Sequence, residues 1–144
     1  MKEFEHRVRD SFARQAVMTT IGARLSRVDT GEVEIELPYR ADLTQQHGFI
    51  HAGIVSTILD SACGYAAFTL MPADAAVLSV EFKVNLLAPA KGERFIARAR
   101  VKKRGRVISV CDADAFAVSE GGEKLVASMT GTMMCLEGRG GLTG

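Results

Sequence analysis

The segment from residue 45 to residue 68 carries one acidic side chain, Asp60, in an otherwise apolar stretch. A carboxylate among apolar neighbours is costly unless it is paired, hydrogen-bonded or used in a reaction. Such a group can activate water as a general base, or attack a carbonyl carbon as a nucleophile. It can also simply hydrogen-bond to Ser56, Ser61 or a neighbouring amide. We therefore treat Asp60 as the first candidate catalytic residue and keep both readings open.

Gly53 lies seven residues before Asp60, where an apolar helix is expected to begin. The first N–H groups of a helix have no partner inside it, and the helix dipole is positive at that end. A glycine there lets a substrate carbonyl approach a backbone donor, as in an oxyanion hole. Seven residues of helix rise about 10.5 Å, so one small carbonyl cannot touch both groups of one helix. If both act on one carbon, Asp60 must come from a second copy in a symmetric dimer.

The helix that positions these groups is predicted from apolar residues that recur every four positions. The rows are Ile54, Ile58, Ala62 and Ala66, and Val55, Leu59, Cys63 and Ala67. This period indicates a buried helix that begins near Ala52 or Gly53. Gly53, Ser56, Asp60 and Gly64 share a narrower face of small and polar residues, which could line a ligand slot or allow close backbone approach.

Strands are predicted on both sides of this helix. They cover residues 23–29, 32–38, 77–87, 93–103, 106–118 and 124–136. Alternating apolar and polar residues give each strand one buried and one exposed face. In the 77–87 strand, Ser79 is expected to point away from the helix, whereas the residues facing the helix are Leu78, Val80, Phe82, Val84 and Leu86. A long antiparallel sheet wrapped around one apolar helix buries the faces of both, which is an α+β fold.

Composition and charge narrow the function classes. The chain has 144 residues, is 47% hydrophobic and 24% charged, and has a net charge of +1. These values fit one globular domain and imply no bulk attraction to nucleic acid or membrane surfaces. The charged N-terminus is not a signal peptide, and no apolar run is long enough to span a membrane. Cys63, Cys111 and Cys135 are odd in number and lie in apolar runs, so we expect reduced thiols in a cytoplasmic protein.

Several standard sites are not indicated. His47 and His51 have the spacing of a helical metal pair, but they lie in a loop without a third ligand, so no metal site is predicted. Neither a serine-hydrolase elbow nor a standard phosphate-binding glycine loop occurs. A basic cluster at a predicted hairpin (Lys102, Lys103, Arg104 and Arg106) either holds phosphates at a pocket mouth or keeps a solvated turn polar.

One motif resembles the active-site signature of hotdog-fold acyl-CoA thioesterases, in particular the branch of phenylacetate-pathway and 4-hydroxybenzoyl-CoA thioesterases. The motif is Gln45-x2-Gly48-x2-His51-Ala52-Gly53-x6-Asp60, and the resemblance extends from about residue 20 to residue 136. Family members usually have a glycine in place of Ala52, and many have an asparagine in place of Gln45.

The resemblance implies a role for each matching residue. Asp60 would be the base or nucleophile, and the Gly53 amide would polarise the thioester carbonyl. His51 would lie near the thioester, and Gln45 would orient the carboxylate or the water. Gly48 and Ser79 would contribute to substrate binding. Lys103, Arg104 and Arg106 would hold the nucleotide end of coenzyme A, and the small side chains of Ala62, Ala66 and Ala67 would line an acyl or aryl pocket.

The expected organisation of the chain has three parts, and the resemblance implies how copies of it assemble. We expect an N-terminal amphipathic helix (1–19), a single hotdog domain (20–137) and a flexible tail (138–144), with the first helix over residues 3–18. The expected enzyme is a homodimer that assembles further into a homotetramer. It needs no metal or cofactor, since coenzyme A is part of the substrate. Two alternatives stay open: a hotdog hydratase-dehydratase acting on acyl-CoA or acyl-carrier protein, and a non-catalytic acyl-CoA-binding protein.

Overall fold

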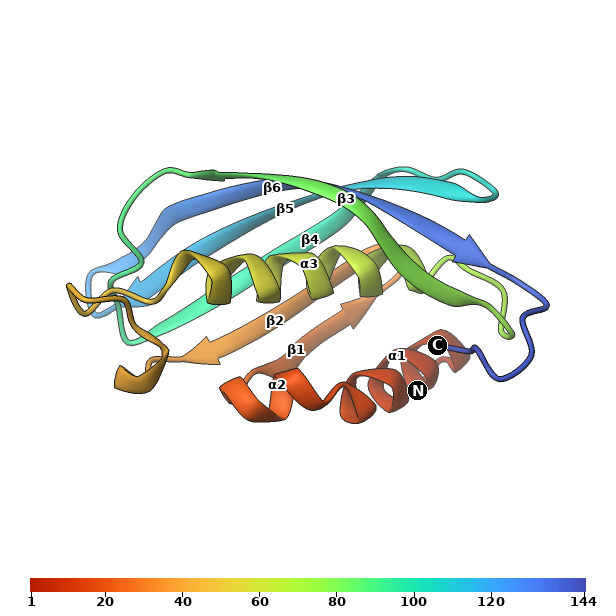
Figure 1. The fold of residues 1–144 in the computed structure, drawn as a ribbon, viewed down its shortest axis with the longest axis horizontal. Helices are drawn as coiled ribbons and strands as arrows, with labels where there is room; N and C mark the ends of the chain where they lie inside the picture. The colour runs from red at the N-terminus through yellow and green to blue at the C-terminus, as the bar shows by residue number, and fades with distance from the viewer.

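The computed structural model describes residues 1–144 as one antiparallel sheet wrapped around a long helix (Figure 1). The sheet has six strands in the order β1-β2-β4-β5-β6-β3. The strands are β1 (Arg24–Asp29), β2 (Glu32–Pro38), β3 (Ala76–Leu86), β4 (Arg94–Lys103), β5 (Ile108–Ser119) and β6 (Gly122–Leu136). The helices are α1 (Glu3–Arg14), α2 (Ala16–Ile21) and α3 (Ala52–Phe68), with a short 3-10 turn, η1 (Ala41–Leu43). The predicted α+β hotdog arrangement is confirmed.

Helix α3 occupies the concave face of the sheet and contacts β2, β3, β4, β5 and β6. The sheet surface beneath it is rich in buried alanines: Ala97 and Ala99 in β4, and Ala113, Ala115 and Ala117 in β5. Small side chains on the sheet let the helix approach closely at the packing density of a protein interior. Burial of both apolar surfaces stabilises the fold and fixes the position of the helix.

The edge strand β3 contains a bulge between Ser79 and Glu81. Before the bulge, Ser79 pairs with the fully buried Met133; after it, Phe82 pairs with Gly131. Gly131 faces α3, since a Cβ on it would lie 3.6 Å from Cys63. The extra residue of a bulge interrupts the alternation of a strand. As a result, Ser79 and Phe82 both lie on the side of β3 that faces α3.

The bulge corrects the predicted faces of this strand. The prediction is right after the bulge, where Val84 packs against the core. It is wrong before the bulge, because Leu78 and Val80 point outward and are 47% and 52% exposed. It is also wrong for Ser79, which points toward α3 and not away from it.

The N-terminal helix is interrupted, so the single helix predicted over residues 3–18 is wrong in its last turn. Gln15 has an extended backbone (φ −82°, ψ 95°) and separates α1 from α2. Its side-chain oxygen accepts a hydrogen bond from the Ser61 hydroxyl of α3 at 2.9 Å. The amphipathic character expected of this segment is present in α1, where Val8 is fully buried and Phe12 packs against the core, whereas Ala16 at the start of α2 is exposed.

The two chain ends lie close together beside α1 (Figure 1). The carbonyl of Gly144 accepts a hydrogen bond from the Arg14 guanidinium. The cysteines at 63, 111 and 135 are buried free thiols. None of the helices combines the length and apolar character needed to cross a membrane.

Candidate active site

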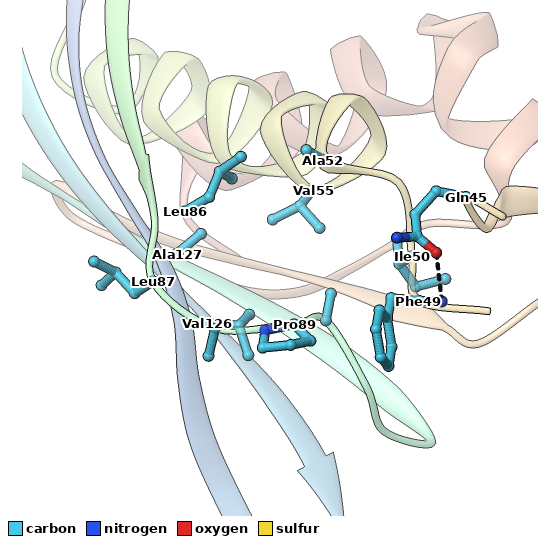
Figure 2. Close-up of a pocket in the computed structure, with 12 residues that line it drawn as sticks. Gln45, Phe49, Ile50, Ala52, Val55, Leu86, Leu87, Pro89, Val126 and Ala127 are labelled. Carbon is cyan, nitrogen blue, oxygen red and sulfur yellow. Dashed lines mark hydrogen bonds between the residues drawn. The ribbon is translucent and has the colours of Figure 1, made fainter. Parts of the chain in front are cut away.

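A hydrogen-bonded turn positions Gln45 in the loop before α3. Its side-chain oxygen accepts hydrogen bonds from the N–H of His47 at 2.6 Å and of Phe49 at 3.2 Å. The amide nitrogen is therefore left free to donate, and it lies on the cavity side in Figure 2. Gly48 has φ +85°, in the left-handed region that favours glycine. Gly48 thus shapes the turn that holds Gln45.

His51 caps the N-terminus of α3. Its Nδ1 accepts a hydrogen bond from the N–H of Gly53 at 2.8 Å. A Cβ on Gly53 would lie 3.1 Å from this nitrogen, so the imidazole packs closely against the glycine. The N–H that the sequence suggests as an oxyanion donor is therefore occupied in the free protein. Because Nδ1 accepts, a neutral ring carries its proton on Nε2.

An apolar cavity of about 470 Å³ lies beside this helix start (Figure 2). Its size is typical of small-molecule sites. Four segments supply the wall: the loop before α3, the first turn of α3, the chain from β3 toward β4, and β6. The lining residues are Gln45, Phe49, Ile50, Ala52, Val55, Leu86, Leu87, Ala88, Pro89, Ala90, Val126 and Ala127. Gln45 is the one polar side chain among them.

The residues expected to line the acyl pocket do not form this cavity. Ala62, Ala66 and Ala67 are buried in the core between α3 and the sheet. They lie on the part of α3 that packs in the core and not at its N-terminal turn. Residues 86–90, at and after the end of the predicted 77–87 strand, supply five of the twelve lining residues of this cavity. These five residues are all apolar, and this composition could have indicated a cavity wall.

Asp60 lies in a different and smaller hollow. Its Oδ1 accepts a hydrogen bond from the Ser79 hydroxyl at 2.6 Å, because the bulge turns Ser79 toward α3. The hollow is about 190 Å³ and is also lined by Gln15, Ser61 and Tyr65. No residue lines both this hollow and the apolar cavity. Within one chain, the carboxylate is therefore separated from Gln45 and from the start of α3.

The basic hairpin lies at the far end of α3. Arg104 and Arg106 line a small hollow together with Ala67 and Leu70, near the C-terminal end of the helix. The 17 residues of α3 make it about 25 Å long. In Figure 1, the β4–β5 hairpin and the loop before α3 lie at opposite ends of the molecule. Lys103, Arg104 and Arg106 are therefore remote from His51 of the same chain.

Comparison with known proteins identifies the family. Residues 47–123, more than half of the chain, match the sequence model of the thioesterase superfamily. The chain belongs to the thioesterase superfamily. The matched region contains the motif residues His51, Gly53 and Asp60, together with Ser79. The protein is a thioester hydrolase, as the motif implied.

Solved structures place this thioesterase among hotdog proteins. A thioesterase family protein from Silicibacter pomeroyi is 60% identical, with a TM-score of 0.92, and the alignment covers 94% of this chain and 99% of that one. The E. coli PaaI protein from the phenylacetic acid degradation operon is 20% identical, with a TM-score of 0.83 and 94% of both chains covered. Thioesterase HI1161 from Haemophilus influenzae is 20% identical, with a TM-score of 0.79 and coverage of 88% and 87%. The latter two share the fold.

Proposed function

We propose that this thioesterase hydrolyses acyl-CoA or aryl-acyl-CoA at a site shared by two protomers. The observation that carries the proposal is the separation of the candidate groups in one chain. Gln45, Gly53 and the apolar cavity lie at the start of α3, whereas Asp60 lies in another hollow further along it. A second copy that supplies Asp60 joins these parts into one site.

The exposed edge of the sheet supports such a dimer. Strand β3 has no partner on its outer side, and it exposes the apolar side chains of Leu78, Val80 and Phe82. An unpaired apolar edge is a template for pairing with another chain. A two-fold axis at this edge would continue the sheet and set the two α3 helices side by side. We infer a homodimer of this kind, with a dimer of dimers as the larger assembly.

The proposed reaction begins when the thioester carbonyl takes the place of the His51 imidazole at the Gly53 N–H. The positive end of α3 and this donor stabilise the negative charge that develops on the oxygen. Gln45 offers its amide hydrogens to the carboxylate or to the water. The acyl group occupies the apolar cavity, whose wall suits an aliphatic or aromatic group.

Asp60 of the second protomer drives the cleavage by one of two routes. As a base, it takes a proton from water while the water oxygen attacks the carbonyl carbon; the C–S bond then breaks and the proton passes to the sulfur. As a nucleophile, it attacks the carbonyl carbon and forms an acyl anhydride as the C–S bond breaks and the thiolate leaves; water then opens the anhydride, which restores the carboxylate and supplies the proton that the thiolate takes up. Both routes give a free acid and coenzyme A. Neither uses a metal ion or a cofactor beyond the coenzyme A of the substrate.

The basic hairpin fits the nucleotide end of the substrate in the same assembly. Side-by-side antiparallel helices bring the C-terminal end of one α3 toward the N-terminal end of the other. Lys103, Arg104 and Arg106 of the second protomer would then approach the mouth of the site. Guanidinium and ammonium groups bind phosphate oxygens through charge-assisted hydrogen bonds.

The decisive experiment measures thiol release from acyl- and aryl-CoA substrates by the wild type and by Asp60→Asn. We expect the wild type to release coenzyme A and the variant to lose nearly all turnover while the oligomer persists. Asp114→Asn is the matched control, because Asp114 accepts a hydrogen bond from the Ser128 hydroxyl at the same 2.6 Å but lies on the outer face of the sheet. Near-normal turnover by Asp60→Asn would refute the assignment. Hydration without thiol release, or binding without turnover, would favour the two alternative functions.

A further inference from the structure

A second hollow lies next to the apolar cavity, and a single side chain belongs to both. The apolar cavity is about 470 Å³ and the second hollow about 460 Å³. The second hollow is lined by Tyr39, His47, Gly48, Phe49, Lys91 and Gly92. Phe49 is the one residue in both linings. Phe49 therefore lies between two spaces of similar size.

Both backbone polar groups of Phe49 are hydrogen-bonded to Gln45. Its N–H donates to the side-chain oxygen of Gln45 at 3.2 Å, and its carbonyl accepts from the Gln45 N–H at 2.8 Å. Figure 2 shows the ring next to Pro89, at the end of the cavity away from Leu86. The anchored backbone holds the attachment point of the ring at this end of the cavity. The wall also shares its anchor with Gln45, a proposed site residue.

The two spaces differ in chemistry. Gln45 is the one polar side chain of the apolar cavity, whereas the second hollow contains the polar side chains of Tyr39, His47 and Lys91. The hydroxyl of Tyr39 donates to the carbonyl of Gly48 at 3.2 Å, which ties β2 to the turn. An alkyl chain that extended past Phe49 would move from the apolar cavity into the polar, open hollow. Such a chain gains little from burial beyond this point.

We propose that Phe49 determines the acyl specificity of this enzyme, because its ring ends the cavity and limits the length of the acyl group. The inference rests on the proposed function, in which the acyl group occupies this cavity. The wild type therefore prefers compact aryl or short aliphatic acyl groups. Removal of the ring joins the two spaces and admits longer chains.

The test is the profile of kcat/KM across straight-chain acyl-CoA substrates, from butyryl-CoA to dodecanoyl-CoA, followed by thiol release. We expect Phe49→Ala to move the optimum to longer chains, with a gain of about fourfold for each added methylene that fits in the volume vacated by the ring, and no further gain for methylenes that reach the polar hollow. Phe49→Leu should move the optimum in the same direction by less, and Phe49→Trp should shorten it. An unchanged profile in Phe49→Ala would overturn the proposal. A uniform change of KM for every chain length would also overturn it, since the cavity would then hold the pantetheine arm.

Two controls separate the possible failures. Phe116→Ala removes the same ring from the outer face of the sheet, where Arg98 stacks on it at 4.9 Å from the ring centroid. This variant should keep the wild-type profile. Phe49 lies outside the buried core cluster, and Phe49→Leu carries the test if the alanine variant does not fold. Absence of thiol release by the wild type would refute the proposed function itself, whereas wild-type turnover with an unshifted variant would refute the role of Phe49 alone.

Discussion

The hydroxyl of Ser79 donates a hydrogen bond to Asp60 across 2.6 Å, from the edge strand to the central helix. This contact joins the carboxylate proposed for catalysis to the edge at which a second protomer is expected to bind. Asp60 is about half buried, and Ser79 is its hydrogen-bond partner within the chain. The bond fixes the orientation of the carboxylate.

Ser79→Ala should lower kcat by about ten- to hundredfold, less than Asp60→Asn, because hydrogen bonds to charged groups contribute about 1.5–3 kcal/mol. Steady-state kinetics should show the loss mainly in kcat and little change in KM, since Ser79 positions Asp60 and holds no part of the acyl group. Ser128→Ala removes a serine with the same 2.6 Å bond to Asp114 and should leave the kinetics unchanged. Equal kinetics for the two alanine variants would rule out a positioning role.

His51→Ala should destabilise the protein, because the Gly53 N–H loses the side chain that caps it. The loss of an N-cap costs about 1 kcal/mol, which corresponds to a Tm about 3 °C lower for a domain of this size. His51→Asn should keep most of the stability, since asparagine is also a good N-cap. His47→Ala is the control, because only the backbone of His47 is hydrogen-bonded. Thermal unfolding distinguishes these variants, and an equal Tm for all of them would contradict a capping role.

A mixture of two inactive variants should recover activity if the site is shared. Asp60→Asn damages the carboxylate half, and Gln45→Ala damages the half at the start of α3. Random exchange gives mixed dimers in which one of two sites is intact, so the mixture should reach about a quarter of wild-type turnover. Co-expression with two affinity tags isolates the mixed dimers, and thiol-release assays on this doubly tagged species should show about half of wild-type turnover. Activity no higher than that of the separate variants would place both groups in one protomer.

Buried thiols should make the protein less stable in alkali. Burial raises the pKa of the Cys63 thiol far above its usual range and that of Cys111 to about 12. The folded state keeps these protons, whereas the thiols of the unfolded chain lose them near pH 8.5. The free energy of unfolding therefore falls as the pH rises above about 8.5. The slope approaches about 1.4 kcal/mol per pH unit for each thiol. Urea unfolding under reducing conditions measures it, and Cys111→Ala should show a shallower slope than the wild type. Parallel slopes would mean that other groups cause the decline.

Local patterns were enough to predict the elements that carry the site. The four-residue rows of α3 placed its start at Ala52 or Gly53, and α3 runs over Ala52–Phe68. The strands were predicted from the alternation of apolar and polar residues. Both this period of two residues and the helical period of 3.6 can be recognised from neighbouring residues in the sequence. The motif from Gln45 to Asp60 led to the correct family for the same reason. These features depend on neighbours within one element.

Contacts between distant segments decided the rest. The side of β3 on which Ser79 lies was mispredicted because the bulge arises from pairing with β6, and one extra residue reverses the faces of a strand. The apolar cavity was not predicted because four separate segments enclose it. Consecutive residues were sufficient to define the helix, the strands and the order of the candidate groups. The covering of the Gly53 N–H by His51, the contact of Ser79 with Asp60 and the separation of Asp60 from the apolar cavity could not be predicted in this way, because they depend on which surfaces the packed sheet brings together.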